Sequence, residues 1–169
     1  EAETRTAALV AAARKAGADA ADALYVCNAS TQISVRLGTL EDVERSEGEE
    51  IGLRLFVGSR SASVSSSDLS ADAMAALVDR AVAMAREAPE DPYAGLAPED
   101  RLLRGPSVDV DGDDNADPTP AELRTRAEAA EEAARGVQGV TNSEGAGASA
   151  SRTVIALATS TDFARGYST

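Results

Sequence analysis

The sequence contains no histidine and no tryptophan, and it has a single cysteine among its 169 residues. Without histidine, imidazole cannot serve here as a metal ligand, a general base or a proton shuttle. Cys27 cannot form a disulfide within the chain because it has no second cysteine to pair with. No apolar run approaches the roughly 20 residues that cross a bilayer, and no signal-peptide pattern opens the chain. We therefore expect a cytoplasmic protein without a membrane partner.

Aromatic residues are also scarce, at 3% of the chain. The core must then be built from Ala, Val, Leu and Ile, with little of the aromatic area that dominates binding hot spots. Lysine and arginine number 16 against 29 aspartates and glutamates, which gives a net charge of -13 at pH 7. Such a charge repels phosphate backbones, so nucleic acid is not expected as a direct partner.

Residues 1–89 have the pattern of one α+β domain. An apolar stripe over residues 6–16, stopped by Gly17, predicts a first helix, and Ser70 is placed to cap a second one. Between them, apolar and polar residues alternate with the period of strands. This alternation predicts an antiparallel sheet of about five strands packed with two helices. The strands are expected near residues 24–27, 33–37, 40–47, 51–57 and 60–66.

The same alternation predicts the core of this domain. We expect one sheet face to be covered by apolar residues of the two helices. The expected sheet residues are Ile33, Val35, Ile51, Leu53 and Leu55, and the helix residues are Leu9, Val10, Leu77 and Val78.

The rest of the chain divides at two points. Residues 90–118 form an acidic linker rich in Pro and Gly. Thr119, Pro120 and Glu122 then form a capping box that predicts a helix ending at Gly136. Two strands of a second sheet are expected after it, at residues 137–150 and 153–158, so residues 119–169 are interpreted as the start of a middle α+β domain. One helix and two strands are too few to close a core. We therefore expect a fragment, or a domain completed by a partner.

An acidic series in the linker has part of the spacing of a calcium loop. If Asp111 is the first position, Asp113, Asn115 and Glu122 fall at the third, fifth and twelfth. Ala116 stands where such a loop needs glycine, and Glu122 is better explained as the capping-box residue. A solvated linker is the favoured interpretation. The complete series is Asp109, Asp111, Asp113, Asp114 and Asp117.

Four other features suggest chemistry without supporting it. The serines of residues 59–67 lack a positioned base, since Lys15 is the one lysine of the chain and lies on the first helix. Cys27 is interpreted as structural. The glycines of residues 145–147 lack the context of a dinucleotide site. The acidic helix with Glu128, Glu131 and Glu132 is interpreted as a solvated face. No catalytic, cofactor-binding or metal-binding residue is therefore assigned.

Six motifs in order resemble the N-terminal portion of the TldD/PmbA family, and the last is more like PmbA, also called TldE, than TldD. They cover nearly the whole chain, although no one of them is specific. The motifs are residues 16–21 (AGADAA), 35–38 (VRLG), 52–58 (GLRLFVG), 66–70 (SSDLS), 91–96 (DPYAGL) and 140–146 (VTNSEGA).

The resemblance implies a metallopeptidase assembly in which the TldD-type subunit carries a zinc motif and the PmbA-type subunit lacks it. It implies a noncatalytic region that builds the wall of a cavity and contacts a TldD-like sister subunit or a second copy, with an unfolded peptide as substrate. No cofactor is expected in this chain. The family's older label, modulator of DNA gyrase, fits poorly with the acidic charge. The alternative is a stand-alone peptide-binding or protein-interaction module that uses an exposed sheet edge.

Overall fold

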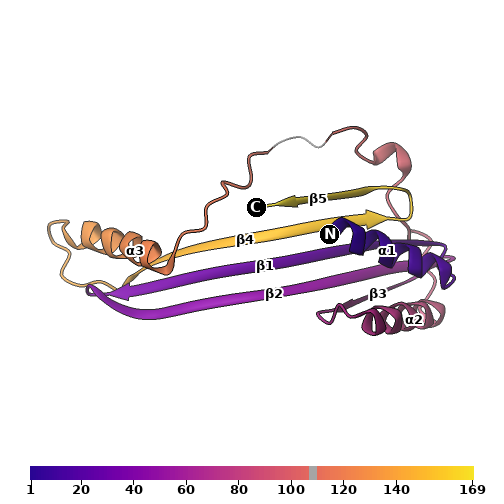
Figure 1. Ribbon diagram of the computed structural model, residues 1–169, viewed down its shortest axis with the longest axis horizontal. Helices are drawn as coiled ribbons and strands as arrows, with labels where there is room; N and C mark the ends of the chain where they lie inside the picture. The colour runs from indigo at the N-terminus through magenta and orange to yellow at the C-terminus, as the bar shows by residue number, and fades with distance from the viewer. Residues whose placement is uncertain (107–109) are drawn as a thin grey trace. The chain divides into compact units, whose positions relative to one another are not determined.

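The computed structural model describes residues 1–106 and 110–169 (Figure 1). In these residues it has an antiparallel sheet of five strands and three α-helices, which confirms the α+β class. The sheet order is β3-β2-β1-β4-β5. The strands are β1 (Ala20–Arg36), β2 (Thr39–Val57), β3 (Arg60–Ser66), β4 (Ala146–Thr159) and β5 (Ala164–Ser168). The helices are α1 (Ala2–Lys15), α2 (Ala71–Glu87) and α3 (Pro120–Arg135), with a short 3-10 helix at Glu99–Arg101.

The five strands are not the five that the alternation suggested. The first two expected strands are one continuous strand, β1, and the next two are also one strand, β2. Gly48 does not interrupt β2, because its backbone has no positive φ that would turn the chain. A glycine permits a turn without requiring one. The first block therefore supplies three strands instead of five.

Strands β4 and β5 complete the count, and this corrects the expectation of a second sheet. The two strands expected at residues 137–150 and 153–158 are one strand, β4, which begins at Ala146, and β5 was not predicted. β4 pairs with β5 in antiparallel register, with Ile155 opposite Tyr167 and Leu157 opposite Arg165. β4 also lies next to β1 in the sheet order, so both strands extend the sheet that β1 to β3 begin (Figure 1). The domain boundaries at residues 89 and 118 stay a prediction.

The chain forms two compact units. Unit 1 consists of Glu1–Cys27, Gly48–Val110 and Val154–Ser168, and unit 2 consists of Asn28–Glu47, Asp111–Thr153 and Thr169. The strands β1, β2 and β4 contribute residues to both units. None of the helices in the described residues is long and apolar enough to cross a membrane.

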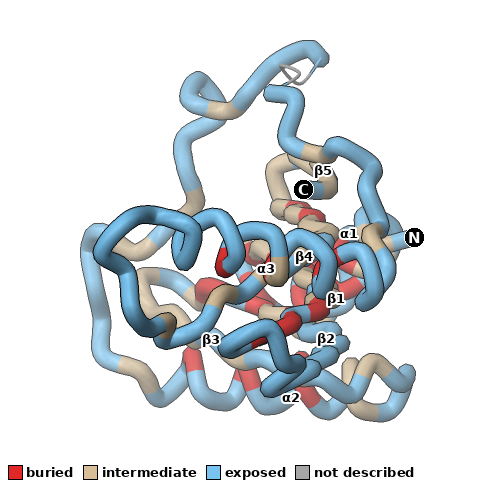
Figure 2. Tube along the Cα trace, turned by 90° about the vertical axis from the view of Figure 1, so that its left-hand side faces the viewer, coloured by how far each residue is buried: buried red, intermediate tan, exposed pale blue. Residues whose placement is uncertain are grey.

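The core of unit 1 lies between α1, α2 and one face of its strands, where the buried positions follow the strands in Figure 2. Leu53 and Leu55 of β2 alternate with the exposed Arg54, and both are buried at 1% exposure or less. Alanines with no exposed surface, such as Ala13, Ala81 and Ala85, let the helices approach the sheet closely. The prediction is confirmed for Ile51, Leu53 and Leu55 and for Leu9, Val10, Leu77 and Val78, which share this core.

Ile33 and Val35 have a different cover from the one expected. They are buried in unit 2 with Leu123 and Ala127 of α3, beside partly buried alanines of β4. The expectation that the first two helices cover them is wrong. The cause is the length of β1. Its second half, with Ile33 and Val35, lies in a second core cluster, which α3 covers.

Helices α2 and α3 begin at the capping residues that the sequence predicts, and α3 also ends where predicted. The Thr119 side chain accepts a hydrogen bond from the Glu122 backbone, and the Glu122 carboxylate accepts one from the Thr119 backbone, so the capping box is present. Pro120 opens α3 and Gly136 caps its end, as predicted. Ser70 caps α2 by accepting a hydrogen bond from the Ala73 N–H. These local signals are read correctly because each depends on residues within one turn.

Candidate interaction surfaces

Among the residues that the structure describes, one face of the sheet in unit 1 has no α-helix packed on it. The helices of unit 1 pack on the side that carries Ala23, Tyr25, Leu53 and Ala156. Side chains alternate across a strand, so their neighbours point to the other side. There Leu24 is 43% and Tyr167 58% exposed. We call this apolar surface the uncovered patch, and it consists of Leu24, Val26, Ile155, Leu157 and Tyr167.

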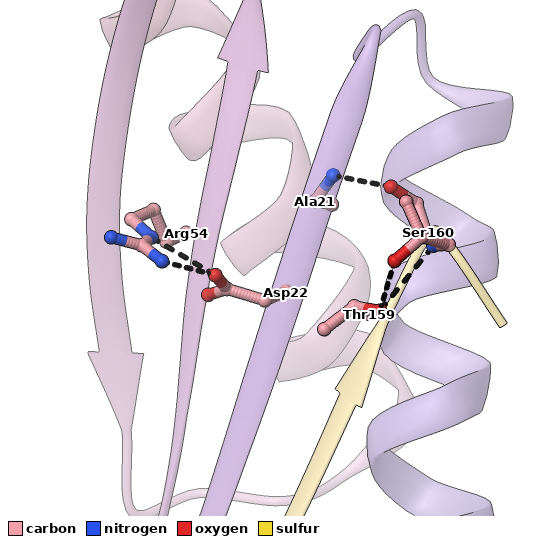
Figure 3. A network of polar contacts seen from close by, with 6 residues as sticks. Ala21, Asp22, Arg54, Thr159 and Ser160 are labelled. Atoms are coloured by element: carbon pink, nitrogen blue, oxygen red, sulfur yellow. Dashed lines mark hydrogen bonds and ion pairs between the residues drawn. The ribbon is translucent and has the colours of Figure 1, made fainter. Parts of the chain in front are cut away.

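Strand register brings these residues together. The Ser160 N–H donates to the Ala21 carbonyl at 2.8 Å. The Ala21 N–H donates to the Ser160 hydroxyl at 3.0 Å (Figure 3). Counting along the antiparallel strands from this pair places Leu24 opposite Leu157 and Val26 opposite Ile155. Tyr167 stands opposite Ile155 on the next strand. The uncovered patch is therefore continuous across β1, β4 and β5.

An ion pair borders this patch. Arg54 of β2 and Asp22 of β1 point toward each other in Figure 3, and the Arg54 Nε donates to Asp22 Oδ2 at 3.0 Å. The Arg54 guanidinium also lies 5.4 Å from the centre of the Phe56 ring. Next to the pair, Gly52 leaves a shallow cavity of about 320 Å³ beside Leu24 and the serines of β3. Arg165, opposite Leu157, lies on the same face and donates to the Gly105 carbonyl at 3.0 Å. The surface thus offers apolar area with one ion pair and one further cation, a composition suited to packing against a protein.

The helix side of unit 1 carries a polar contact that the sequence did not suggest. The Tyr25 hydroxyl donates to Glu49 Oε2 at 2.7 Å. Burial, followed by this hydrogen bond, raises the pKa of Tyr25 above its ordinary value. The phenol therefore keeps its proton at neutral pH and acts as a donor that ties β1 to β2.

A larger apolar cavity, of about 580 Å³, lies between α1 and α2. Alanines and Met74 line it, Ile51 contributes from the sheet, and Lys15 and Asp79 border it. Lys15 lies in the last turn of α1 and is exposed, and within the described part of the chain no hydrogen bond joins it to a serine of β3. The lining is apolar apart from Arg5, Lys15 and Asp79, which suits contact with apolar atoms.

In unit 2, the buried carboxylate of Glu131 holds the turn between β1 and β2. It accepts hydrogen bonds from the Leu37 N–H at 2.7 Å and the Gly38 N–H at 2.8 Å. Both turn residues have positive φ, 51° and 76°. Hydrogen bonds from the Ser143 side chain, and then from these backbone groups, lower the pKa of Glu131. The interpretation of Glu131 as part of a solvated face is wrong, because only 2% of it is exposed.

The acidic linker does not form a metal cluster in the residues that the structure describes. No three His, Cys, Asp or Glu side chains among those residues are close enough to hold an ion. Asp109 lies outside the described residues. Asp113 pairs with Arg152 at 3.1 Å, the Asp114 carboxylate accepts from the Ala116 N–H at 2.9 Å, and Glu122 serves the capping box.

The remaining residues that the sequence singled out have structural positions. Cys27 packs beside the core of unit 1. Ser61, Ser63 and Ser65 lie along β3, where Ser63 stands opposite Arg54. Gly145 approaches β1 so closely that a Cβ would lie 2.7 Å from the Val35 carbonyl oxygen, and its φ is +108°. The absence of a side chain at Gly145 therefore lets the backbone just before β4 pack closely against β1.

Comparisons with known proteins agree with the resemblance. The family model described as PmbA/TldA metallopeptidase domain 1 matches residues 21–85. "Metalloprotease PmbA" of Escherichia coli O157:H7 is 34% identical over 128 residues, which cover 75% of this chain and 28% of that protein. The solved structure of TldE from Thermococcus kodakarensis matches with a TM-score of 0.78 and 13% identity, over 97% of this chain and 36% of that one.

A second solved structure is similar in fold. A Bacteroides thetaiotaomicron protein assigned as a modulator of DNA gyrase matches with a TM-score of 0.87 and 20% identity, over 98% of this chain and 38% of its own. The sequence and fold define a metallopeptidase-like domain. The chain belongs to the TldD/PmbA family, as an N-terminal portion. It spans less than a third of the length of the curated relative.

Proposed function

We propose that this chain is the noncatalytic N-terminal region of a PmbA/TldE-like subunit in a zinc metallopeptidase complex that processes peptides. In that role its sheet lines a cavity and contacts a TldD-like sister subunit. The observation that carries the proposal is the uncovered patch. A continuous strip of apolar residues without a covering helix is suited to a subunit contact.

Zinc would be supplied by the sister subunit. The chain has no histidine, and its described carboxylates and Cys27 do not gather into a ligand set. The residues therefore do not fit a zinc site, and no hydrolytic step is assigned to them. Their part in the complex is to shape the space in which a peptide is held.

Assembly with a TldD-type subunit from the same genome tests the proposal. The purified chain alone should hold no stoichiometric zinc after dialysis against a weak chelator, and should cleave no peptide. Mixed with the subunit, it should form a complex in sedimentation velocity. Ile155→Asp should abolish this complex, and Tyr167→Ser, at a more exposed site, should weaken it.

The matched control is Val137→Asp, because Val137 is 59% exposed and lies outside the patch. That variant should assemble normally. One-to-one zinc in the chain alone would contradict the assignment of zinc to the sister subunit, and cleavage that follows the chain through purification would show that it is catalytic by itself. Unchanged assembly of both patch variants would show that the contact is elsewhere.

The second candidate is a module that binds an extended polypeptide at a sheet edge. The observation that supports this candidate is that β2 extends well beyond the stretch that pairs with β3. β3 pairs with β2 from Ile51 to Val57, whereas residues 39–50 of β2 are exposed throughout. Exchange of the backbone amides in this stretch, with and without a peptide, tests the candidate.

A further inference from the structure

The outer edge of β2 in unit 2 is open along residues 39–47. β3 ends before it reaches this stretch, and among the described residues no other strand pairs with that side of β2. An open edge presents unpaired N–H and C=O groups that can pair with another extended chain. Leu40 and Val43, at 38% and 50% exposed, add aliphatic area.

This edge carries an excess of negative charge. Glu41, Asp42, Glu44 and Glu47 lie on it with one cation, Arg45. The Arg45 Nε donates to Glu47 at 3.0 Å and its guanidinium also reaches the Thr31 hydroxyl at 3.2 Å, so Arg45 is engaged locally. The ion pairs of the described residues leave Glu41, Asp42 and Glu44 without a cationic partner.

The charge decides between two occupants of the edge. A second copy of this chain would place carboxylates beside carboxylates, and like charges on neighbouring strands are destabilising. A lysine- or arginine-rich segment would place ammonium or guanidinium groups beside them. Opposite charges on paired strands are favourable and steer the encounter.

We propose that residues 39–47 of β2 bind an extended, basic polypeptide segment by strand addition. This inference rests on the second of the two proposed functions, the sheet-edge module, and not on the peptidase complex. Backbone pairing would provide the binding, and Glu41, Asp42 and Glu44 would select the partner's charge.

Hydrogen exchange on the full 169-residue chain, with a ten-residue peptide of alternating lysine and threonine, tests the proposal. The peptide should slow exchange of the amides of residues 39–47 and of no other segment. A peptide of the same sequence with alternate backbone nitrogens methylated keeps the charge but loses donors, so it should give no protection. A peptide of alternating glutamate and threonine should not bind.

Two triple variants separate the edge from the general charge of the chain. Glu41→Gln with Asp42→Asn and Glu44→Gln should weaken binding about tenfold, which corresponds to ~1.4 kcal/mol over three exposed ion pairs. The control, Asp79→Asn with Glu132→Gln and Glu144→Gln, removes equal charge from exposed sites elsewhere and should leave binding unchanged. Binding should also weaken as salt shortens the Debye length from about 10 Å at 0.1 M to about 3 Å at 1 M.

The outcomes are distinguishable. Equal protection by the acidic peptide would overturn the basic class of ligand while keeping the edge as a binding site. Binding of the methylated peptide, or equal weakening by both triple variants, would overturn strand addition in favour of nonspecific attraction. No protection by any peptide would overturn the sheet-edge function as well, and would leave the peptidase proposal untouched.

Discussion

Two leucines on neighbouring strands test the assignment of the sheet faces in unit 1. Leu53 is 1% exposed in the core, and Leu24 is 43% exposed in the uncovered patch. Leu53→Ala removes a side chain that the core closes around, and such changes cost about 2 to 5 kcal/mol of unfolding free energy. Leu24→Ala removes the same atoms from a half-exposed site, where little transfer free energy is lost and no closed cavity forms, so about 1 kcal/mol or less is expected.

Urea unfolding measures the difference. With a slope of about 2 kcal/mol per molar urea, a loss of 3 kcal/mol moves the midpoint by about 1.5 M for Leu53→Ala, and by about 0.5 M or less for Leu24→Ala. Circular dichroism and tyrosine fluorescence should be followed together, because two units can unfold separately. Leu24→Ala should instead weaken assembly with the sister subunit. Equal shifts of the two midpoints would refute the assignment of the faces.

Three further predictions concern unit 2. Glu131→Gln should destabilise the protein at neutral pH. Because the folded-state pKa of Glu131 lies below its ordinary value of 4.5, its stabilisation is present above that value and is lost as the pH falls through the folded pKa. The difference between wild type and variant in thermal unfolding should therefore shrink in acid, and a constant difference would contradict the carboxylate's role. Thr119→Ala should cost about 1 kcal/mol in urea unfolding by removing the helix cap, and no change would contradict the capping box. Gly145→Ala should cost more than about 1 kcal/mol, whereas Gly95→Ala, with open space around it, should be nearly neutral; equal effects would contradict the close approach of Gly145 to β1.

The sequence predicted what depends on neighbouring residues. The capping box of α3 needs residues within one turn, and the alternation of Leu53, Arg54 and Leu55 assigns their faces through the pleat of one strand. At Leu24 the alternation assigned no face, because Tyr25 and Leu24 are both apolar and only Tyr25 is buried in the core. Apolar residues on both faces of a strand cannot show which face a helix covers.

The remaining errors come from contacts that are distant in sequence. Glu131 reaches a turn 93 and 94 residues away, and its partners are backbone groups that any residue possesses. No side-chain pattern could therefore identify it. The pairing of β4 with β1 could not be predicted from the sequence either, because it depends on contacts between segments more than a hundred residues apart. Two strands alone suggested an incomplete second sheet, whereas β4 and β5 complete the first sheet.

The scarcity of aromatic residues connects the core to the proposed surfaces. The helices approach the sheet through alanines, so little aromatic area is needed inside, and little is available outside. A protein that lacks tryptophan and has few tyrosines cannot rely on the aromatic anchors that dominate most binding hot spots. Its strands offer what remains, which is aliphatic area on the uncovered patch and unpaired backbone groups on the edge of β2. The two differ in how they respond to solution conditions, since burial of aliphatic area tolerates salt and attraction between exposed charges does not. Assembly through the patch should therefore persist at a salt concentration that releases a basic peptide from the edge.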